Sequence, residues 1–331
     1  MLLKLFKGNQ PPTLFLIIIA GLLLWLPSMI MPSVTLLPFE EYPTLLQIIF
    51  TGWISNHPHL QVILSYVLIV LLGLAVNWLN GKHFFIHERS FLPVLFVVFI
   101  SSTIPEIHKC FVVVLSSFFM VLALDRIFIT YGLNRISFNY FEAALLLSIA
   151  SLLYFNIIIF FFILWISIII LRPFHWREWI TPLFGLLIPY MFLFASYYLI
   201  YGEIAGLLVQ YRMYFSHPAV SFSFQLPVLV WLGLLGLLII LASYHMILKF
   251  TTKKVSSRRF LLIVFWVFLL TLAGYFILPL ASVELLYILS VSVTYLFTTY
   301  FLFQKPSWYV EMVFTVLFLC LCALRVLYVI G

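Results

Sequence analysis

Apolar runs about as long as a membrane is thick follow one another from residue 13 to residue 330. The hydrocarbon layer of a bilayer is about 30 Å thick, and a helix needs roughly 20 apolar residues to cross it. The chain is 65% hydrophobic and only 8% charged, which places it outside the range of soluble domains. We therefore predict an all-α, polytopic transmembrane bundle that forms a single membrane domain over residues 1–331.

Because one crossing needs roughly 20 apolar residues, the apolar runs predict about eleven spans, within a range of roughly 9 to 12. The first span shows no small-residue cleavage site, so we expect it to stay in the protein as an anchor. Two long segments between spans, 34–59 and 201–227, are predicted to be outer loops. The predicted spans are 13–33, 60–80, 91–105, 108–125, 138–155, 157–171, 179–200, 228–248, 260–280, 284–303 and 308–330.

The basic residues predict the orientation of the bundle, because loops on the cytoplasmic side are enriched in Lys and Arg. With a cytoplasmic N-terminus, fourteen of the 17 basic residues fall in inner loops. Only Lys109, Arg212 and Arg325 then remain on the outer side, and the C-terminus faces outward. The fourteen inner residues are Lys4, Lys7, Lys82, Arg89, Arg126, Arg135, Arg172, Arg177, Lys249, Lys253, Lys254, Arg258, Arg259 and Lys305. This pattern is typical of a bacterial inner (cytoplasmic) membrane protein.

Two pairs of spans are joined by very short turns, one at residues 106–109 and one at Asn156. A helix of 15 residues rises only about 22 Å, so both turns should lie below the outer membrane surface. Polar groups at that depth must be covered by protein or face a wet cavity. In the first outer loop, polar residues recur at helical spacing opposite apolar ones, which predicts an interfacial helix over 43–54. The aromatic-rich second outer loop is also predicted to be interfacial.

The sequence has no motif of a familiar soluble catalytic site. A nucleotide-binding loop, a metalloprotease helix, a nucleophile elbow and a Cys/His cluster are all missing, so we predict no metal site and no evident cofactor. The three cysteines are interpreted as packing residues. The net charge of +7 comes from short loops between helices, so it indicates membrane topology and membrane lipids as partners, with no nucleic acid.

Glu40 and Glu41 are the candidate catalytic residues, because they lie just beyond the outer end of the first span. A carboxylate held between membrane and water can act as a general base toward a hydroxyl acceptor. Two structural interpretations stay open. Both side chains can solvate the loop, or they can stabilise the N-terminus of the helix that follows Pro43.

The candidate substrate-binding residues are placed around the same outer loop. Glu106, His108 and Lys109 occupy the turn between two short spans, where they can meet the acidic loop in one outer cavity. Lys109 and Arg212 offer positive charge to a phosphate at headgroup level, and His57 closes the first outer loop. The structural alternative is that Glu106 pairs with Lys109 three residues later and neutralises the turn.

In its order of features the N-terminal half resembles the polyprenyl-lipid-dependent glycosyltransferases of the GT-C superfamily. One span, an outer acidic loop with an interfacial helix and short paired spans follow each other in both. The whole chain is also similar to an uncharacterised family of bacterial multi-pass inner-membrane proteins. The residues behind these likenesses are Phe39 to Tyr42, the helix 43–54, Asn56 to Pro58, and the run Phe141 to Gly185 with Ser148 to Tyr154 and Arg172 to Trp179.

The GT-C resemblance implies an enzyme of cell-envelope biogenesis that uses a polyprenyl-phosphate-linked donor in an outward cavity. Glu40 or Glu41 would then be the base, while Lys109 and Arg212 would bind phosphate. A second hypothesis is a non-catalytic subunit or scaffold that binds a membrane-protein partner. A third is a carrier for a small molecule or lipid, against which the scarcity of charges within the spans argues.

Overall fold

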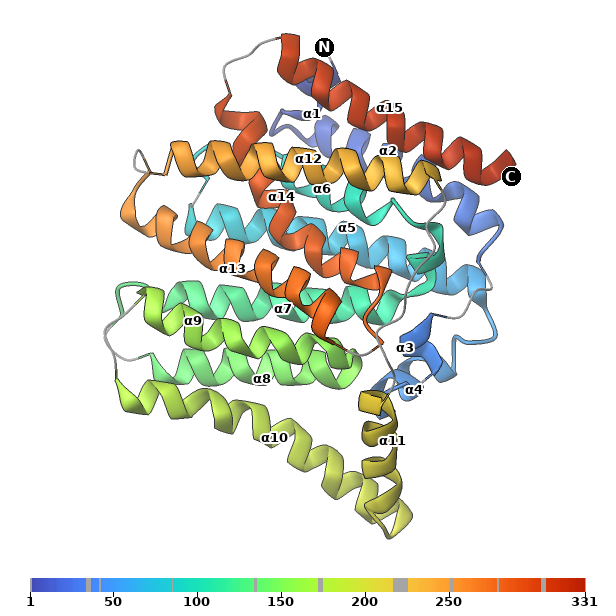
Figure 1. The fold of residues 1–331 in the computed structure, drawn as a ribbon, viewed down its shortest axis with the longest axis vertical. Helices are drawn as coiled ribbons and strands as arrows, with labels where there is room; N and C mark the ends of the chain where they lie inside the picture. Colours follow the sequence, from blue (N-terminus) through green and yellow to red (C-terminus); the bar gives the residue numbers. More distant parts are fainter. Residues whose placement is uncertain are drawn as a thin grey trace.

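The computed structural model describes residues 2–33, 37–41, 43–84, 86–133, 136–171, 175–216, 226–250, 253–278, 280–304 and 308–330. Every regular element within these ranges is a helix, so the all-α prediction is confirmed for them (Figure 1). The predictions that involve Tyr42, Arg135, residues 172–174, residues 217–225 and Lys305 lie outside the described residues.

The helices follow each other with short connections. They are α1 Leu2–Phe6, α2 Pro11–Ile30, α3 Pro38–Glu41, α4 Leu45–Gly52, α5 Pro58–His83, α6 Leu92–Ser101, η1 Pro105–Lys109, α7 Phe111–Ile129, α8 Ser137–Leu153, η2 Phe155–Phe161, α9 Phe162–Leu171, α10 Trp176–Tyr201, α11 Ala205–Ser216, α12 Leu226–Leu248, α13 Val255–Ile277, η3 Val283–Leu285, α14 Leu286–Phe303 and α15 Trp308–Ile330. Three of them, η1, η2 and η3, are 3₁₀-helices.

Among the described residues, eight helices are long and apolar enough to cross a membrane, which supports a multi-pass membrane protein. Three shorter apolar helices occupy the other predicted spans, namely Leu92–Ser101, Ser137–Leu153 and Phe155–Leu171. The count of about eleven crossings stays a prediction, because these three are shorter than a full crossing.

Helix α14 is the centre of the bundle and packs against α6, α7, α12 and α13. The membrane-length part of the segment Val283–Phe303, which includes α14, is 94% buried, although α14 contains several serines and threonines. Hydroxyls on this helix donate to carbonyls of their own helix, as Ser290 does to Tyr287 and Thr298 does to Thr294. Small side chains with satisfied hydroxyls let neighbouring helices approach closely in a membrane.

One end of the bundle collects basic residues that the charge pattern assigns to the inner side. Lys82 Nζ lies 2.7 Å from Asp125 Oδ2, and His83 Nε2 lies 2.8 Å from Asp125 Oδ1. Other cations donate to carbonyls at the C-terminal ends of helices, where positive charge is favourable: Lys7 to Leu302, Lys249 to Phe303 and Arg259 to Leu171. The predicted inner residues that make these contacts therefore share one end, and its cytoplasmic location stays a prediction.

Helices α3, α4 and α11 lie together at the other end, toward which α15 and the C-terminus also run (Figure 1). The predicted helix over 43–54 is observed as α4, which Thr44 caps by accepting the N–H of Gln47. Its polar face points into the protein, since Thr44 is buried and its hydroxyl donates to Leu152 O at 2.6 Å. Ile49 and Trp53 are 69% and 72% exposed. An outward apolar face is what an interfacial helix presents to lipid.

Candidate functional site

An ion pair joins the acidic loop to the turn between α6 and α7. Lys109 Nζ, on η1, lies 2.8 Å from Oε2 of Glu40, on α3. The same carboxylate oxygen accepts the backbone N–H of Leu37 at 2.8 Å. The side chains of Glu40 and Lys109 are only 20% and 10% exposed, so this pair is largely shielded from solvent. Two of the residues predicted to share an outer site are thus in direct contact.

His108 lies on the opposite side of η1, entirely within protein. Its ring stacks on Trp25 with centroids 3.6 Å apart and planes 6° from parallel. Burial lowers the pKa of His108 well below its usual value, and the charge of Arg325 lowers it further. A guanidinium can only donate, so the His108 Nε2 that lies 2.8 Å from Arg325 Nη2 accepts a hydrogen bond and carries no proton. His108 is a buried packing residue and the partner of a buried arginine.

A second acidic residue, Glu284, organises a buried polar network that we name the Glu284 cluster: Glu284, Ser282, Tyr154, Asn156 and Tyr214. Glu284 Oε1 accepts the Tyr154 hydroxyl at 2.8 Å and the Ser282 backbone N–H at 3.0 Å. Glu284 Oε2 accepts the Ser282 hydroxyl. Asn156 donates to the Tyr154 oxygen at 3.0 Å and accepts from the Tyr214 hydroxyl at 2.7 Å.

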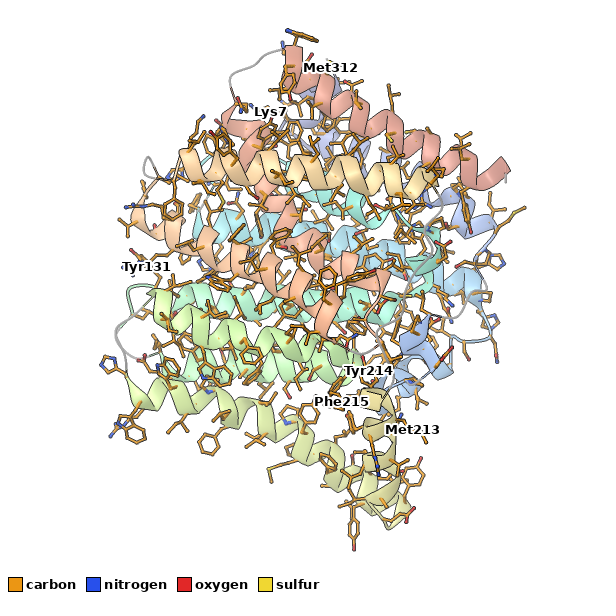
Figure 2. The ribbon with its side chains drawn as sticks, in the orientation of Figure 1. Lys7, Tyr131, Met213, Tyr214, Phe215 and Met312 are labelled. Atoms are coloured by element: carbon orange, nitrogen blue, oxygen red, sulfur yellow. The ribbon has the colours of Figure 1, made fainter. Side chains whose placement is uncertain are left out.

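The cluster assembles where two helical segments depart from regular α-geometry and α11 packs against them. Tyr154 is the extended residue that ends α8 and precedes η2, while Glu284 lies in η3 at the head of α14. Tyr214 comes from the end of α11 that lies against the bundle (Figure 2). Burial raises the pKa of the Tyr214 hydroxyl, and the charge of Glu284 adds to this rise. The short turn at Asn156 therefore contributes to a protein-covered polar centre.

The Glu40–Lys109 pair and the Glu284 cluster are neighbours. The ring of Phe39 on α3 packs edge-on against Tyr154, with centroids 5.4 Å apart. Burial raises the pKa of the Cys110 thiol well above its usual value, and the charges of both Glu40 and Glu284 add to this rise. Cys110 therefore lies within the electrostatic reach of both carboxylates, which belong to one polar end of the bundle.

The other predicted site residues lie around this centre and not inside it. Glu41 and His57 have exposed side chains, and so does Arg212 on α11. Glu106 is partly buried, and its backbone carbonyl accepts the Ser33 hydroxyl at 3.4 Å. Of the seven candidates, the structure brings Glu40 and Lys109 together and buries His108 on the far side of their turn.

Glu284 is the main residue that the sequence-based search did not select. The signal was present, because Glu284 is the only charged residue between Arg259 and Lys305. A lone carboxylate at the head of an apolar segment must find hydrogen-bond donors in the fold. Ser282, two residues earlier, supplies its backbone N–H and its hydroxyl. The third donor is Tyr154, 130 positions away, which the sequence does not place beside Glu284.

An apolar cavity of about 320 Å³ reaches this centre from between α12, α13 and α14. Ser282 and Val283 line it at the side of the Glu284 cluster. Phe276 and Leu272 line it on α13, and their side chains are 77% and 41% exposed. Within the described ranges, no group of three or more His, Cys, Asp or Glu side chains is placed to hold a metal ion.

Comparison of the chain with family models, curated proteins and solved structures finds no match. The family membership and the GT-C likeness expected from the sequence therefore stay predictions. What the protein does has to be inferred from the polar end of the bundle and the cavity beside it.

Proposed function

We propose that this protein is a membrane-embedded transferase that moves a group from a lipid-linked donor to a hydroxyl acceptor at the Glu284 cluster. The observation behind this proposal is an apolar cavity with a serine in its wall whose hydroxyl is bonded to a buried carboxylate. The cavity is about 320 Å³ and is lined by Ser282, whose hydroxyl donates to Glu284 Oε2. Pockets that are mostly apolar with a few converging polar groups are typical of ligand sites.

The choice of the catalytic base follows from the contacts that each carboxylate already makes. Glu40 forms an ion pair with Lys109 and accepts the backbone N–H of Leu37. Glu41 is exposed to solvent. We therefore assign the role of proton acceptor to Glu284. An acceptor hydroxyl that replaces the Ser282 hydroxyl would contact Glu284 Oε2 directly, and a positioned carboxylate is a general base.

The proposed step is a displacement at the transferred group. The hydroxyl oxygen of the acceptor forms the new bond, and its proton passes to Glu284. The bond between the transferred group and the lipid phosphate breaks, and the phosphate oxygen keeps the electron pair. Lys109, held in place by Glu40, supplies positive charge at the same end of the bundle for that developing anion.

This proposal keeps the donor, the cargo and the location predicted from the sequence, but it assigns the base to Glu284 in place of Glu40 or Glu41. A polyprenyl-phosphate-linked donor fits a site where an apolar cavity adjoins polar groups, and a glycosyl group is the expected cargo. The enzyme would act in envelope biogenesis at the outer face of a bacterial inner membrane, with a GT-C-like arrangement of its N-terminal half. Membrane lipids are then both solvent and substrate.

The test replaces Glu284 with Gln in the native host and quantifies lipid-linked and envelope glycans by mass spectrometry. We expect Glu284→Gln to match the deletion strain while the protein remains in the membrane at normal abundance. Glu203→Gln is the matched control, because it makes the same change at an exposed side chain and should behave as wild type. Full complementation by Glu284→Gln would refute the proposed base.

A non-catalytic membrane subunit is the second candidate, and the surface of α10 favours it. Only 6% of the apolar, membrane-length part of α10 is buried within the protein. Met191 and Phe192 are 66% and 73% exposed, and Leu199 is 83% exposed. A subunit of a complex predicts a co-purifying protein after mild detergent extraction, lost on Met191→Gln and Phe192→Gln, together with full complementation by Glu284→Gln.

A further inference from the structure

A second apolar groove lies between α2 and α15, apart from the cavity at Ser282. It measures about 370 Å³, and its walls include Leu23 and Pro27 from α2 and Phe318 and Val326 from α15. Leu23 is 64% exposed and Val326 is 55% exposed, so the groove opens along the side of the bundle. In a membrane this side faces lipid tails.

Among the described residues, Arg325 is the only charged one that lines this groove, and its side chain is buried with 4% exposure. Its Nη2 donates to His108 Nε2 at 2.8 Å, while its Nε and Nη1 atoms find no hydrogen-bond partner in the part of the chain that the structure describes. His108 is neutral and provides no negative charge. Glu106 is the acidic residue whose charge acts on Arg325, and no ion pair joins the two among the described residues.

A buried guanidinium without a carboxylate partner is unfavourable, and this makes an anion the expected ligand. Nε–H and an Nη–H of one arginine form a fork that matches two oxygens of a phosphate. The apolar walls select for the rest of the ligand, because a free phosphate ion would leave them uncovered, whereas a hydrocarbon tail would fill them.

We infer that the groove between α2 and α15 binds a phosphate-bearing membrane lipid. Its phosphate accepts from the guanidinium of Arg325, and its tail lies along Leu23, Pro27 and Phe318. This site is separate from the proposed transfer site, because η1 presents His108 to Arg325 on one side and Lys109 to Glu40 on the other. It stands whether or not the protein is an enzyme.

The experiment uses the full chain, purified in detergent and stripped of lipid, with binding followed by native mass spectrometry and thermal unfolding. Three probes separate the sources of affinity: phosphatidylglycerol, diacylglycerol with the same acyl chains, and inorganic phosphate. We expect phosphatidylglycerol to bind and to raise the melting temperature. Diacylglycerol and inorganic phosphate should each bind at least about tenfold more weakly.

Two variants test the site from different directions. Arg325→Gln removes the charge and should weaken phosphatidylglycerol binding about tenfold or more, while Arg325→Lys should retain part of it. Ala20→Phe keeps the arginine but fills the groove, so it tests the site even where Arg325→Gln does not fold. Arg89→Gln is the matched control, because it removes the same charge from an exposed side chain.

The inference is overturned by any of three results. Equal binding of diacylglycerol would mean that the phosphate is not recognised. Binding of inorganic phosphate as tight as that of phosphatidylglycerol would mean that the acyl tail is not recognised. Unchanged phosphatidylglycerol binding in both Arg325→Gln and Ala20→Phe would place the lipid elsewhere.

Discussion

Lys109 Nζ lies 2.8 Å from Glu40 Oε2, and this ion pair joins the loop after the first predicted span to the turn between α6 and α7. The residues are 69 positions apart, so the pair closes a long stretch of chain. It also holds α3 against the Glu284 cluster, because Phe39 next to Glu40 packs on Tyr154. The contact fixes one edge of the candidate site.

We expect Glu40→Gln and Lys109→Met each to lower stability, with a coupling energy of about 1 to 3 kcal/mol in a double-mutant cycle. Both side chains are mostly shielded, so the pair is worth more than an exposed one. Thermal or denaturant unfolding in detergent measures the effect. Glu41→Gln changes an exposed side chain beside it and should shift stability by less than about 0.5 kcal/mol. Additive effects of Glu40→Gln and Lys109→Met would contradict the pair.

The apolar runs predicted the helices well, because helix length in a membrane is set by bilayer thickness and not by partners. Helix α4 was also predicted within 43–54, since the spacing of Thr44, Gln47 and Thr51 is a local property. The sorting of basic residues between the two ends was equally readable. Each of these features depends on neighbours in the sequence.

The polar contacts were only partly predictable, because they depend on which helices become neighbours in space. A meeting of the acidic loop with the turn at 106–109 was expected, but the only ion pair considered for Lys109 was with Glu106, and its pairing with Glu40 was not predicted. Arg325 was expected to lie on the outer side, and its contact with His108 of η1 was not predicted. Glu284 was not selected at all, since its long-range donor, Tyr154, lies at the end of α8.

Tyr154→Phe should destabilise the protein by about 1 to 3 kcal/mol. The Tyr154 hydroxyl donates to Glu284 Oε1 and accepts from Asn156, so its removal leaves two buried polar groups each short of one partner. Chemical or thermal unfolding of the purified protein measures the loss. Tyr244→Phe is the control, because Tyr244 is 62% exposed. Equal stability of the two variants would mean that the Tyr154 hydroxyl does not make these hydrogen bonds to Glu284 and Asn156.

Lys253 predicts a pH dependence at the end of the bundle that we assign to the cytoplasm. Burial lowers the pKa of Lys253 to about 8, and the charge of Lys249 contributes. An unfolded lysine titrates near about 10.4, so below about pH 8 both states are charged and burial of the charge opposes folding in full. Between about pH 8 and 10.4 Lys253 loses its proton in the folded state before it does in the unfolded state, so the free-energy cost of burying its charge decreases.

Stability should therefore rise with pH in that window, and Lys253→Met should be more stable than wild type at neutral pH. The difference should shrink toward zero near about pH 10. Melting temperatures between pH 7 and pH 10 measure it, with Lys254→Met at an exposed side chain as the control. A stability gain for Lys253→Met that does not change with pH would show that the side chain stays charged or is already neutral.

Gly185 allows α10 to pack directly on the backbone of α8. A Cβ atom at this position would lie 2.6 Å from both Ala144 Cβ and Phe141 O, and 3.2 Å from Leu145 N. Backbone atoms cannot move aside as a flexible side chain can, so Gly185→Ala must push the two helices apart. Such overpacking costs about 1 to 3 kcal/mol.

Gly233 in α12 is the matched control, because nothing lies within 4 Å of a Cβ built there. Alanine is a better helix former than glycine by about 1 kcal/mol, so Gly233→Ala should be neutral or stabilising. The same chemical change is thus expected to have opposite signs at the two positions, measured as melting temperatures in one detergent. If Gly185→Ala is as stable as Gly233→Ala, α10 does not pack on α8 at the distance described. The exposed face of α10 would then have to be reconsidered as the side that meets the bundle.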